Sequence, residues 1–263
     1  MLSKVFATIA VAITGSILLY GVSDFPAFGD PHSPANAGVP GSESVSLYFI
    51  EESYKDTKVP NIVTSVLADY RGYDTMFETV VIFAAGMAIF AILRVVGNKE
   101  ETAAKAAEED SFTNGDHNRI IVGTTVRIVV PVIQLFALYV VAHGHHSPGG
   151  GFQGGVILGA SFIIIALAEN LNAALRRLSE LNYVRLAAIG IFIYAAFGIM
   201  AQVLGSNFLD YGALQPIFMT DGPEMARSHS MLGVEIGVAF TVTAIMFAIY
   251  ANLASRGKLV KGL

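Results

Sequence analysis

The chain contains no cysteine, which excludes disulfides, thiolate-bound iron–sulfur clusters and cysteine nucleophiles within its 263 residues. It also lacks the motifs of a serine triad, a phosphate loop and a dinucleotide-binding fold. Its net charge of −5 argues against a nucleic-acid-binding protein. Charged residues make up only 14% of the sequence, too few to cover a soluble globule of this length. These absences favour a membrane protein that is not an enzyme in its own right.

Long apolar runs make up much of the chain. Hydrophobic residues account for 54% of it, and the mean hydropathy is +0.59. Each run is close to the length that an α-helix needs to cross the hydrocarbon layer, about 20 residues. The sequence therefore predicts an all-α membrane protein with about six transmembrane helices. The predicted spans are Val5–Val22, Thr75–Val96, Ile120–Ala142, Phe152–Leu171, Leu186–Leu204 and Met231–Leu253.

The first run allows a second interpretation. It is short and only Lys4 precedes it, as in a cleaved signal peptide. No small-residue cleavage site follows Leu18–Tyr20. We therefore interpret the run as a membrane span.

The lysines and arginines are unevenly divided between the two sides of the predicted bundle. With the N-terminus inside, the inner segments hold eleven of them and the outer segments hold four. The remaining one, Arg127, is inside the third span. Because cytoplasmic loops are enriched in Lys and Arg, both termini are predicted to be cytoplasmic, in a multi-pass protein of the cell inner membrane.

Polar segments divide the chain into two modules. Residues 1–96 form the first, with two spans and a long outer segment rich in Pro, Gly and Ser. In that segment Pro60 and Asn61 can cap an amphipathic helix, which packs on another subunit or adsorbs to the membrane surface. Residues 97–118 form an acidic cytoplasmic linker, and residues 119–263 form a second module with four spans.

The second module contains a glycine-rich corner between its first two spans. The stretch from His143 to Gly155 reads HGHHSPGGGFQGG and leads into an apolar run. Gly151, Gly155 and Gly159 recur every four residues, so on a helix they form one stripe that a neighbouring backbone can approach. A plain flexible loop is the alternative interpretation of the corner.

These residues carry a family resemblance. The run PGGGFQGGVILGASF, preceded by His143-Gly-His-His, is similar to the MnhB/MrpB subunit of multisubunit Na+/H+ antiporters and to the related subunit of membrane-bound energy-converting hydrogenases. The first module resembles the C-terminal part of MrpA, or the matching small hydrogenase subunit, through GDPHSPAN, VPNIVTSVLADYRGYDT and ETVVIFAAGMA. The chain thus resembles the tail of MrpA fused to a B-type subunit across the acidic linker.

The resemblance implies a place in an Mrp-type cation/proton antiporter module that moves H+ or Na+. Implied partners are a large antiporter-like subunit and small membrane subunits, or the peripheral subunits of a hydrogenase-like complex. Two functions stay open. The chain is either an ion-translocating subunit, or a scaffold that joins an antiporter-like body to a redox-driven complex without an ion path of its own.

Ionisable residues within the spans are candidates for ion translocation, because a lone charge at mid-bilayer costs about 2.5 to 3.5 kcal/mol on insertion scales. Glu78 and Glu235, with His143 and His145 at similar depth, form a predicted outer set that can relay H+ or Na+. For Glu78 the alternative is a carboxylate that complements the positive end of its helix. For Glu235 the alternative is an interhelical hydrogen bond.

Arg127 and Glu169 form a predicted inner set. Matching depth and opposite charge indicate that they pair, either on an ion route or as a bridge that holds the fold. Pro131 cannot donate the helical hydrogen bond to the carbonyl of Arg127, so a kink there can admit water. The histidine cluster that begins at His143 does not predict a metal site, since no carboxylate is nearby in the sequence. No cofactor is predicted.

Overall fold

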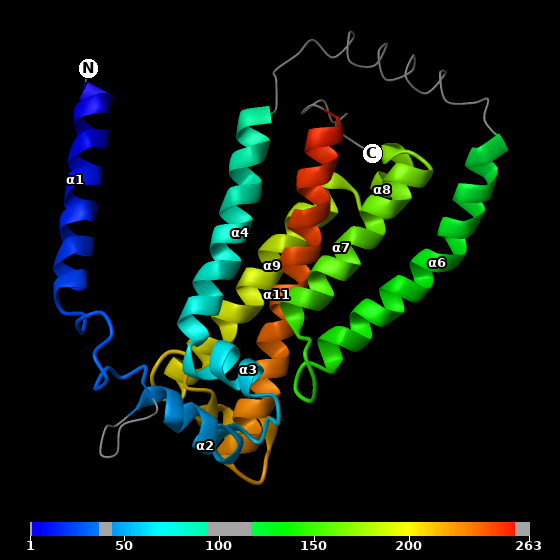
Figure 1. The fold of residues 1–263 in the computed structure, drawn as a ribbon. Coiled ribbons are helices and arrows are strands. Elements are labelled where there is room, and N and C mark those ends of the chain that lie inside the picture. The colour runs from blue at the N-terminus through cyan, green and yellow to red at the C-terminus, as the bar shows by residue number, and fades with distance from the viewer. Residues whose placement is uncertain (1, 37–43, 94–116, 256–263) are drawn as a thin grey trace. The chain divides into compact units, whose positions relative to one another are not determined.

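The structure is a computed structural model that describes residues 2–36, 44–93 and 117–255 (Figure 1). Within these residues the secondary structure is helical, and six helices are long and apolar enough to cross a membrane. The all-α fold class is therefore confirmed, while the side on which the termini lie stays a prediction. The helices are α1 (Leu2–Ser23), α2 (Val45–Thr57), α3 (Ile62–Ser65), the π-helix η1 (Val66–Tyr70), α4 (Gly72–Leu93), α6 (His117–Ala142), α7 (Gly151–Ala168), α8 (Leu171–Arg177), α9 (Glu180–Val203), the 3-10 helix η2 (Tyr211–Leu214), α10 (Gln215–Phe218) and α11 (Pro223–Ala254).

The chain divides into two compact units, Met1–Glu52 and Ser53–Leu263. In the first unit, α1 leaves its apolar side chains exposed, as expected of a helix that lipid or partner helices surround. Every site described below belongs to the second unit. The predicted acidic linker, 97–118, falls almost entirely outside the described residues. The division into two sequence modules stays a prediction.

Three spans begin earlier than the sequence predicted. α4 begins at Gly72, α9 at Glu180 and α11 at Pro223. Polar residues in these first turns continue the helix, and an apolar pattern does not detect them. α11 has 32 residues and is about 48 Å long, so it extends beyond a hydrocarbon layer of about 30 Å.

The fourth span ends earlier than predicted, at Ala168. Asn170 begins the short helix α8, because its side-chain oxygen accepts a hydrogen bond from the backbone N–H of Ala173 at 2.7 Å. Glu169, between the two helices, therefore lies just beyond the span rather than inside it.

α11 is the centre of the second unit. It packs against α9, α7 and α4, and it is drawn in orange to red among them in Figure 1. In its most apolar stretch 67% of the residues are buried, compared with 39% or less in the other long helices. Tyr183 and Tyr194 from α9 and Phe247 from α11 are among the largest fully buried side chains.

The predicted glycine stripe is the surface of α7 that contacts α11. Gly151, Gly155 and Gly159 are all buried. A Cβ atom at Gly155 would lie 3.0 Å from the carbonyl oxygen of Ala239, and one at Gly159 would lie 3.1 Å from that of Thr243. Thr243 also donates through Oγ1 to the carbonyl oxygen of Gly155 at 3.1 Å. The stripe thus lets two helix backbones meet, which confirms its predicted use in helix packing.

Candidate functional site

The glycine corner, residues 143–150, is a tight turn between α6 and α7. The N–H of Gly150 donates to the carbonyl oxygen of Val140 at 3.1 Å, which brings the two helix ends together. Gly150 has a φ of +119°, a backbone conformation that other residues rarely adopt. A Cβ at Gly144 would lie 2.7 Å from the Cα of Gly150. The corner is therefore a defined turn whose glycines allow its backbone to fold tightly.

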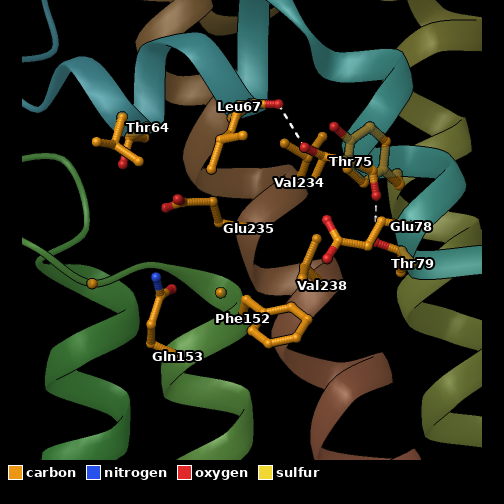
Figure 2. A pocket seen from close by; sticks show the side chains of 15 residues that line it. Thr64, Leu67, Thr75, Glu78, Thr79, Phe152, Gln153, Val234, Glu235 and Val238 are labelled. Carbon is orange, nitrogen blue, oxygen red and sulfur yellow. Dashed lines mark hydrogen bonds between the residues drawn. The ribbon is translucent and has the colours of Figure 1, made fainter. Parts of the chain in front are cut away.

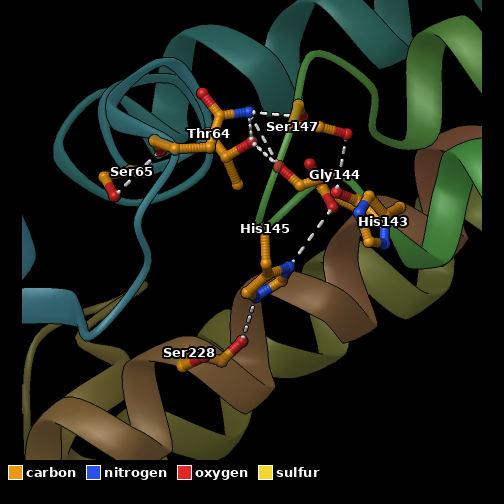
Figure 3. A network of polar contacts seen from close by, with 9 residues as sticks. Thr64, Ser65, His143, Gly144, His145, Ser147 and Ser228 are labelled. Carbon is orange, nitrogen blue, oxygen red and sulfur yellow. Dashed lines mark hydrogen bonds and ion pairs between the residues drawn. The ribbon is translucent and has the colours of Figure 1, made fainter.

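Asn61 fastens the start of α3 to this corner. Its side-chain nitrogen donates to the carbonyl oxygens of Gly144 at 2.8 Å and Ser147 at 2.9 Å. Its side-chain oxygen accepts from the N–H of Val63 at 3.1 Å, the helix cap that the sequence predicted. Thr64 adds a hydrogen bond from its Oγ1 to the carbonyl of Gly144 at 2.8 Å (Figure 3). One polar network thus joins α3 to the corner.

Glu235 lies against the glycine corner from α11. It is 9% exposed, and a Cβ at Gly144 would lie 3.1 Å from its Oε2. Among the described residues, that oxygen has no hydrogen-bond partner. A buried carboxylate oxygen without a partner is costly, so such groups are candidates for a functional site. The interhelical hydrogen bond that we considered for Glu235 is not made by Oε2 to any described residue.

Glu78 and Glu235 line one cavity of about 230 Å³, which we call the carboxylate cavity. Figure 2 shows the two side chains around this space, Glu78 from α4 and Glu235 from α11. Glu78 is exposed, whereas Glu235 is buried. The structure therefore brings together the two carboxylates of the predicted outer set. Other residues that line the cavity include Thr64, Thr75, Thr79, Phe152, Gln153 and Tyr194.

The hydroxyl groups of this cavity are arranged as acceptors. Thr64 donates to the carbonyl of Gly144 at 2.8 Å, Thr75 donates to that of Leu67 at 2.7 Å, and Thr79 donates to that of Thr75 at 2.8 Å. Each hydroxyl thus uses its proton on a carbonyl and offers its oxygen lone pairs to other donors. Acceptor oxygens beside two carboxylates suit protonated water or a small cation rather than an anion.

His145 lies between Glu235 and the backbone of α11. Its Nε2 is 2.9 Å from the carbonyl oxygen of Ser228, and its Nδ1 is 4.0 Å from Glu235 Oε2. Figure 3 shows the ring above Ser228. Burial lowers the pKa of His145 below its usual value, and although the bond to Ser228 opposes this shift, His146 and His229 reinforce it. The imidazole is therefore held in its neutral form at higher acidity than a free histidine.

A second cavity, of about 300 Å³, lies on the other side of His145. We call it the histidine cavity, because His145, His146 and His229 all line it, together with Lys58 and Ser228. His145 thus borders the histidine cavity while it faces the carboxylate that lines the first one. Sequence reasoning placed His229 at this depth but did not predict a shared cavity.

His143 is not brought to either cavity. Its ring stacks on Tyr139, one helical turn earlier, with centroids 4.8 Å apart and planes 18° apart. It is also 5.6 Å from the ring of His146. The aromatic contact accounts for its position, so its predicted part in ion translocation has no geometric support. Among the described residues, no group of three His, Asp or Glu side chains is arranged to hold a metal ion.

Arg127 and Glu169 pair as the sequence predicted. Arg127 Nε lies 2.7 Å from Glu169 Oε1. The side chain of Arg127 is 70% exposed and that of Glu169 is 18% exposed. An open cavity of about 430 Å³ lies beside them, and α6 continues as a helix through Pro131. The pair is far along the chain from Glu235 and belongs to the opposite end of α6 from the glycine corner.

A second ion pair was not predicted. Arg227 on α11 lies 2.6 Å from Asp69 in the π-helix, and the Asp69 side chain is only 6% exposed. Burial raises the pKa of Asp69, although Arg227 opposes the shift. The Arg227 guanidinium also lies over the ring of Tyr70. The sequence marked Asp69 only as a charge at a helix end, because nothing local indicates a partner 158 positions away.

Comparison with known proteins places the corner in a family. Residues 121–248 match the family described as a domain related to the MnhB subunit of Na+/H+ antiporter. The chain is 30% identical over 141 residues to the putative antiporter subunit mnhB2 of Staphylococcus haemolyticus (strain JCSC1435), covering 54% of this chain and 97% of that protein. The chain belongs to the MnhB family. The MnhB match contains the glycine corner, His145 and Glu235, and it confirms the resemblance drawn from the sequence.

Other relatives extend the comparison beyond the MnhB match. Residues 36–110 match the MbhE family, described as the E-type subunit of MBH. The chain is 27% identical over 184 residues to the probable K+/H+ antiporter A/B subunit of Rhizobium meliloti (strain 1021), a match that spans 65% of this chain and only 18% of that protein. Its fold is similar, with a TM-score of 0.54 and 24% identity, to a chain in the structure of the membrane-bound sulfane sulfur reductase (MBS), an archaeal respiratory membrane complex; the match covers 94% of this chain and 98% of that chain.

Proposed function

We propose that this chain is a membrane subunit of an Mrp-type multisubunit cation/proton antiporter module in the cytoplasmic membrane, and that Glu235 lies on its ion route. One observation carries the proposal. Glu235 is 9% exposed, has an oxygen without a partner among the described residues, and lines a cavity of about 230 Å³ with Glu78. A carboxylate in such a place binds a proton or a cation more readily than it stays bare.

Glu78 supplies the second carboxylate of this route. It is exposed at its position on α4, so it exchanges ions with the surroundings of the subunit more readily than Glu235 does. The hydroxyl acceptors between them, Thr75 and Thr79, solvate a passing proton or Na+. Arg127 and Glu169 lie beside a separate open cavity, where they form a second polar station.

Partner subunits complete the route. The proposed partners are a large antiporter-like subunit and small membrane subunits, or hydrogenase-like peripheral subunits. Exposed apolar side chains on α6, such as Ile128, Val132 and Leu135, support contact with lipid or with partner helices. Purification of the intact complex, followed by mass spectrometry of its subunits, separates the two assemblies: nickel–iron or iron–sulfur subunits indicate a redox-driven pump.

Transport by the intact complex in proteoliposomes tests the function. Glu235→Gln keeps the size of the side chain but removes its titration, and we expect coupled H+ and Na+ movement to fall by about tenfold or more, the scale of a lost proton-transfer group. Glu224→Gln is the matched control, since Glu224 is on the same helix but lines neither cavity. Parental transport with Glu235→Gln, in a complex of normal subunit composition, removes Glu235 from the route.

A further inference from the structure

We infer that His145 and Glu235 share one proton and pass it between the histidine cavity and the carboxylate cavity, so that the ion moved at this step is H+ rather than Na+. The inference rests on the proposed function, in which Glu235 lies on the ion route. It adds the species that moves, the residue that transfers it and the cavity to which it leads.

The hydrogen bond to Ser228 fixes the state of the imidazole. The carbonyl oxygen of Ser228 is an acceptor only, and it lies 2.9 Å from Nε2. Nε2 must therefore carry a hydrogen. In neutral His145 the other nitrogen, Nδ1, then has a free lone pair, and this nitrogen is the one that faces Glu235 Oε2.

The two side chains are placed to share one proton. Oε2 has no other partner among the described residues, so it either carries a hydrogen directed at Nδ1 or accepts one from it. The distance of 4.0 Å is too long for a direct hydrogen bond, and a bridging water or a small approach of the ring closes it. The transfer is balanced: neutral acid and neutral imidazole become carboxylate and imidazolium.

The second cavity gives the proton an exit. His145 and His146 line the histidine cavity, which is large enough, at about 300 Å³, for several water molecules. Rotation of the imidazolium away from Ser228 turns a protonated nitrogen toward that cavity, and water takes the proton as hydronium. The reverse order loads Glu235 from the histidine cavity.

An imidazole ring at this position selects the proton by its chemistry. A ring nitrogen binds and releases H+, but a ring does not let Na+ pass through it. The backbone around it is tightly packed, since a Cβ at Gly144 would lie 2.7 Å from Gly150 and 3.1 Å from Glu235 Oε2. A cation that occupies the carboxylate cavity must therefore enter or leave by another path.

The charges around His145 oppose a second proton on the pair. His146 and His229 face it from the corner and from α11, and Lys58 lines the same cavity. Glu235 is the facing anion, with Glu78 across the carboxylate cavity. Burial lowers the pKa of His145, so the resting proton is on Glu235.

Infrared difference spectroscopy of the purified complex tests the shared proton without transport. A pH jump should reveal a protonated carboxyl band that Glu235→Gln abolishes and that His145→Gln shifts in frequency and in titration midpoint. His143→Gln is the matched control, because its ring stacks on Tyr139 outside both cavities. A Glu235 band that is unchanged by His145→Gln overturns the inference.

Proteoliposome transport separates this inference from the proposed function. We expect His145→Gln to slow H+ movement by about tenfold to a hundredfold and to remove its dependence on pH near 6, while Na+ binding is retained. If Glu235→Gln abolishes transport and His145→Gln has no effect, the inference fails and the proposed function stands. Should His145→Gln not assemble, Glu235→Asp replaces it: the shorter side chain must slow H+ movement, and an unchanged rate also overturns the inference.

Discussion

Gly151 on α7 lies so close to Glu235 on α11 that a Cβ atom at position 151 would overlap the Glu235 carbonyl oxygen. Gly151→Ala should therefore push the two helices apart and destabilise the subunit by about 1 to 3 kcal/mol, the usual cost of overpacking. Thermal unfolding of the intact complex measures this. Gly123→Ala on α6 is the control, because a Cβ there meets nothing within 4 Å. Equal stability of both variants contradicts the packing argument.

Removal of Arg227 should strand the buried carboxylate of Asp69. We expect Arg227→Gln to cost about 3 kcal/mol at neutral pH, since one member of a buried pair is left alone. Arg71→Gln breaks a pair whose side chains are more than half exposed, 59% and 57%, and should cost about 0.5 kcal/mol or less.

The loss at Arg227 should also depend on pH. The pKa of Asp69 is raised by burial, and removal of Arg227 takes away the charge that opposes this. The buried carboxylate destabilises the folded state only while it is ionised, so the penalty is full at neutral pH and shrinks as the pH falls through the folded-state pKa. Unfolding of Arg227→Gln between pH 4 and pH 8, compared with the parent, measures the gap. A gap of constant size contradicts the assignment.

The Arg127–Glu169 pair should contribute modestly to stability. Arg127 is 70% exposed, so we expect a coupling energy of about 1 kcal/mol or less from a double-mutant cycle of Arg127→Gln and Glu169→Gln. Transport is the more sensitive readout. If the pair is a polar station on the ion route, each variant should slow transport, and the double variant should be no slower than the worse single one. Additive losses of transport argue instead for two independent effects.

His145 should make the folded protein less stable in acid. Its pKa is lowered in the folded state relative to about 6.5 in the unfolded chain, so the unfolded chain binds the proton first as the pH falls. Stability that is complete above pH 6.5 is lost below it. His145→Gln should flatten this part of the profile of melting temperature against pH, and His143→Gln should not. Parallel profiles for the parent and His145→Gln refute the prediction.

The sequence predicted those features that depend on spacing and depth. The four-residue period of Gly151 and Gly155 predicted their contact with another helix, and the depth and sign of Arg127 and Glu169 predicted their pairing. Matching depth also predicted that Glu235 and a carboxylate from another span meet. Each of these follows from helix geometry alone.

Other features depend on how the chain folds back on itself. Asp69 meets Arg227 only because the π-helix packs on the first turns of α11, and no local pattern specifies that contact. His143 is different, since Tyr139 precedes it by four residues and helical spacing alone would have suggested the stacked rings. The depth argument grouped His143 with His145 because it considered height in the membrane but not direction around the helix axis.

Asn61 has a mechanical consequence. Its amide is at once the cap of α3 and the clamp on the carbonyls of Gly144 and Ser147, which are more than 80 positions away in the chain. The short helix and the turn above Glu235 therefore behave as a single lever. A neighbouring subunit that grips α3 holds the turn as well, and can govern the traffic of protons without reaching the buried acid itself.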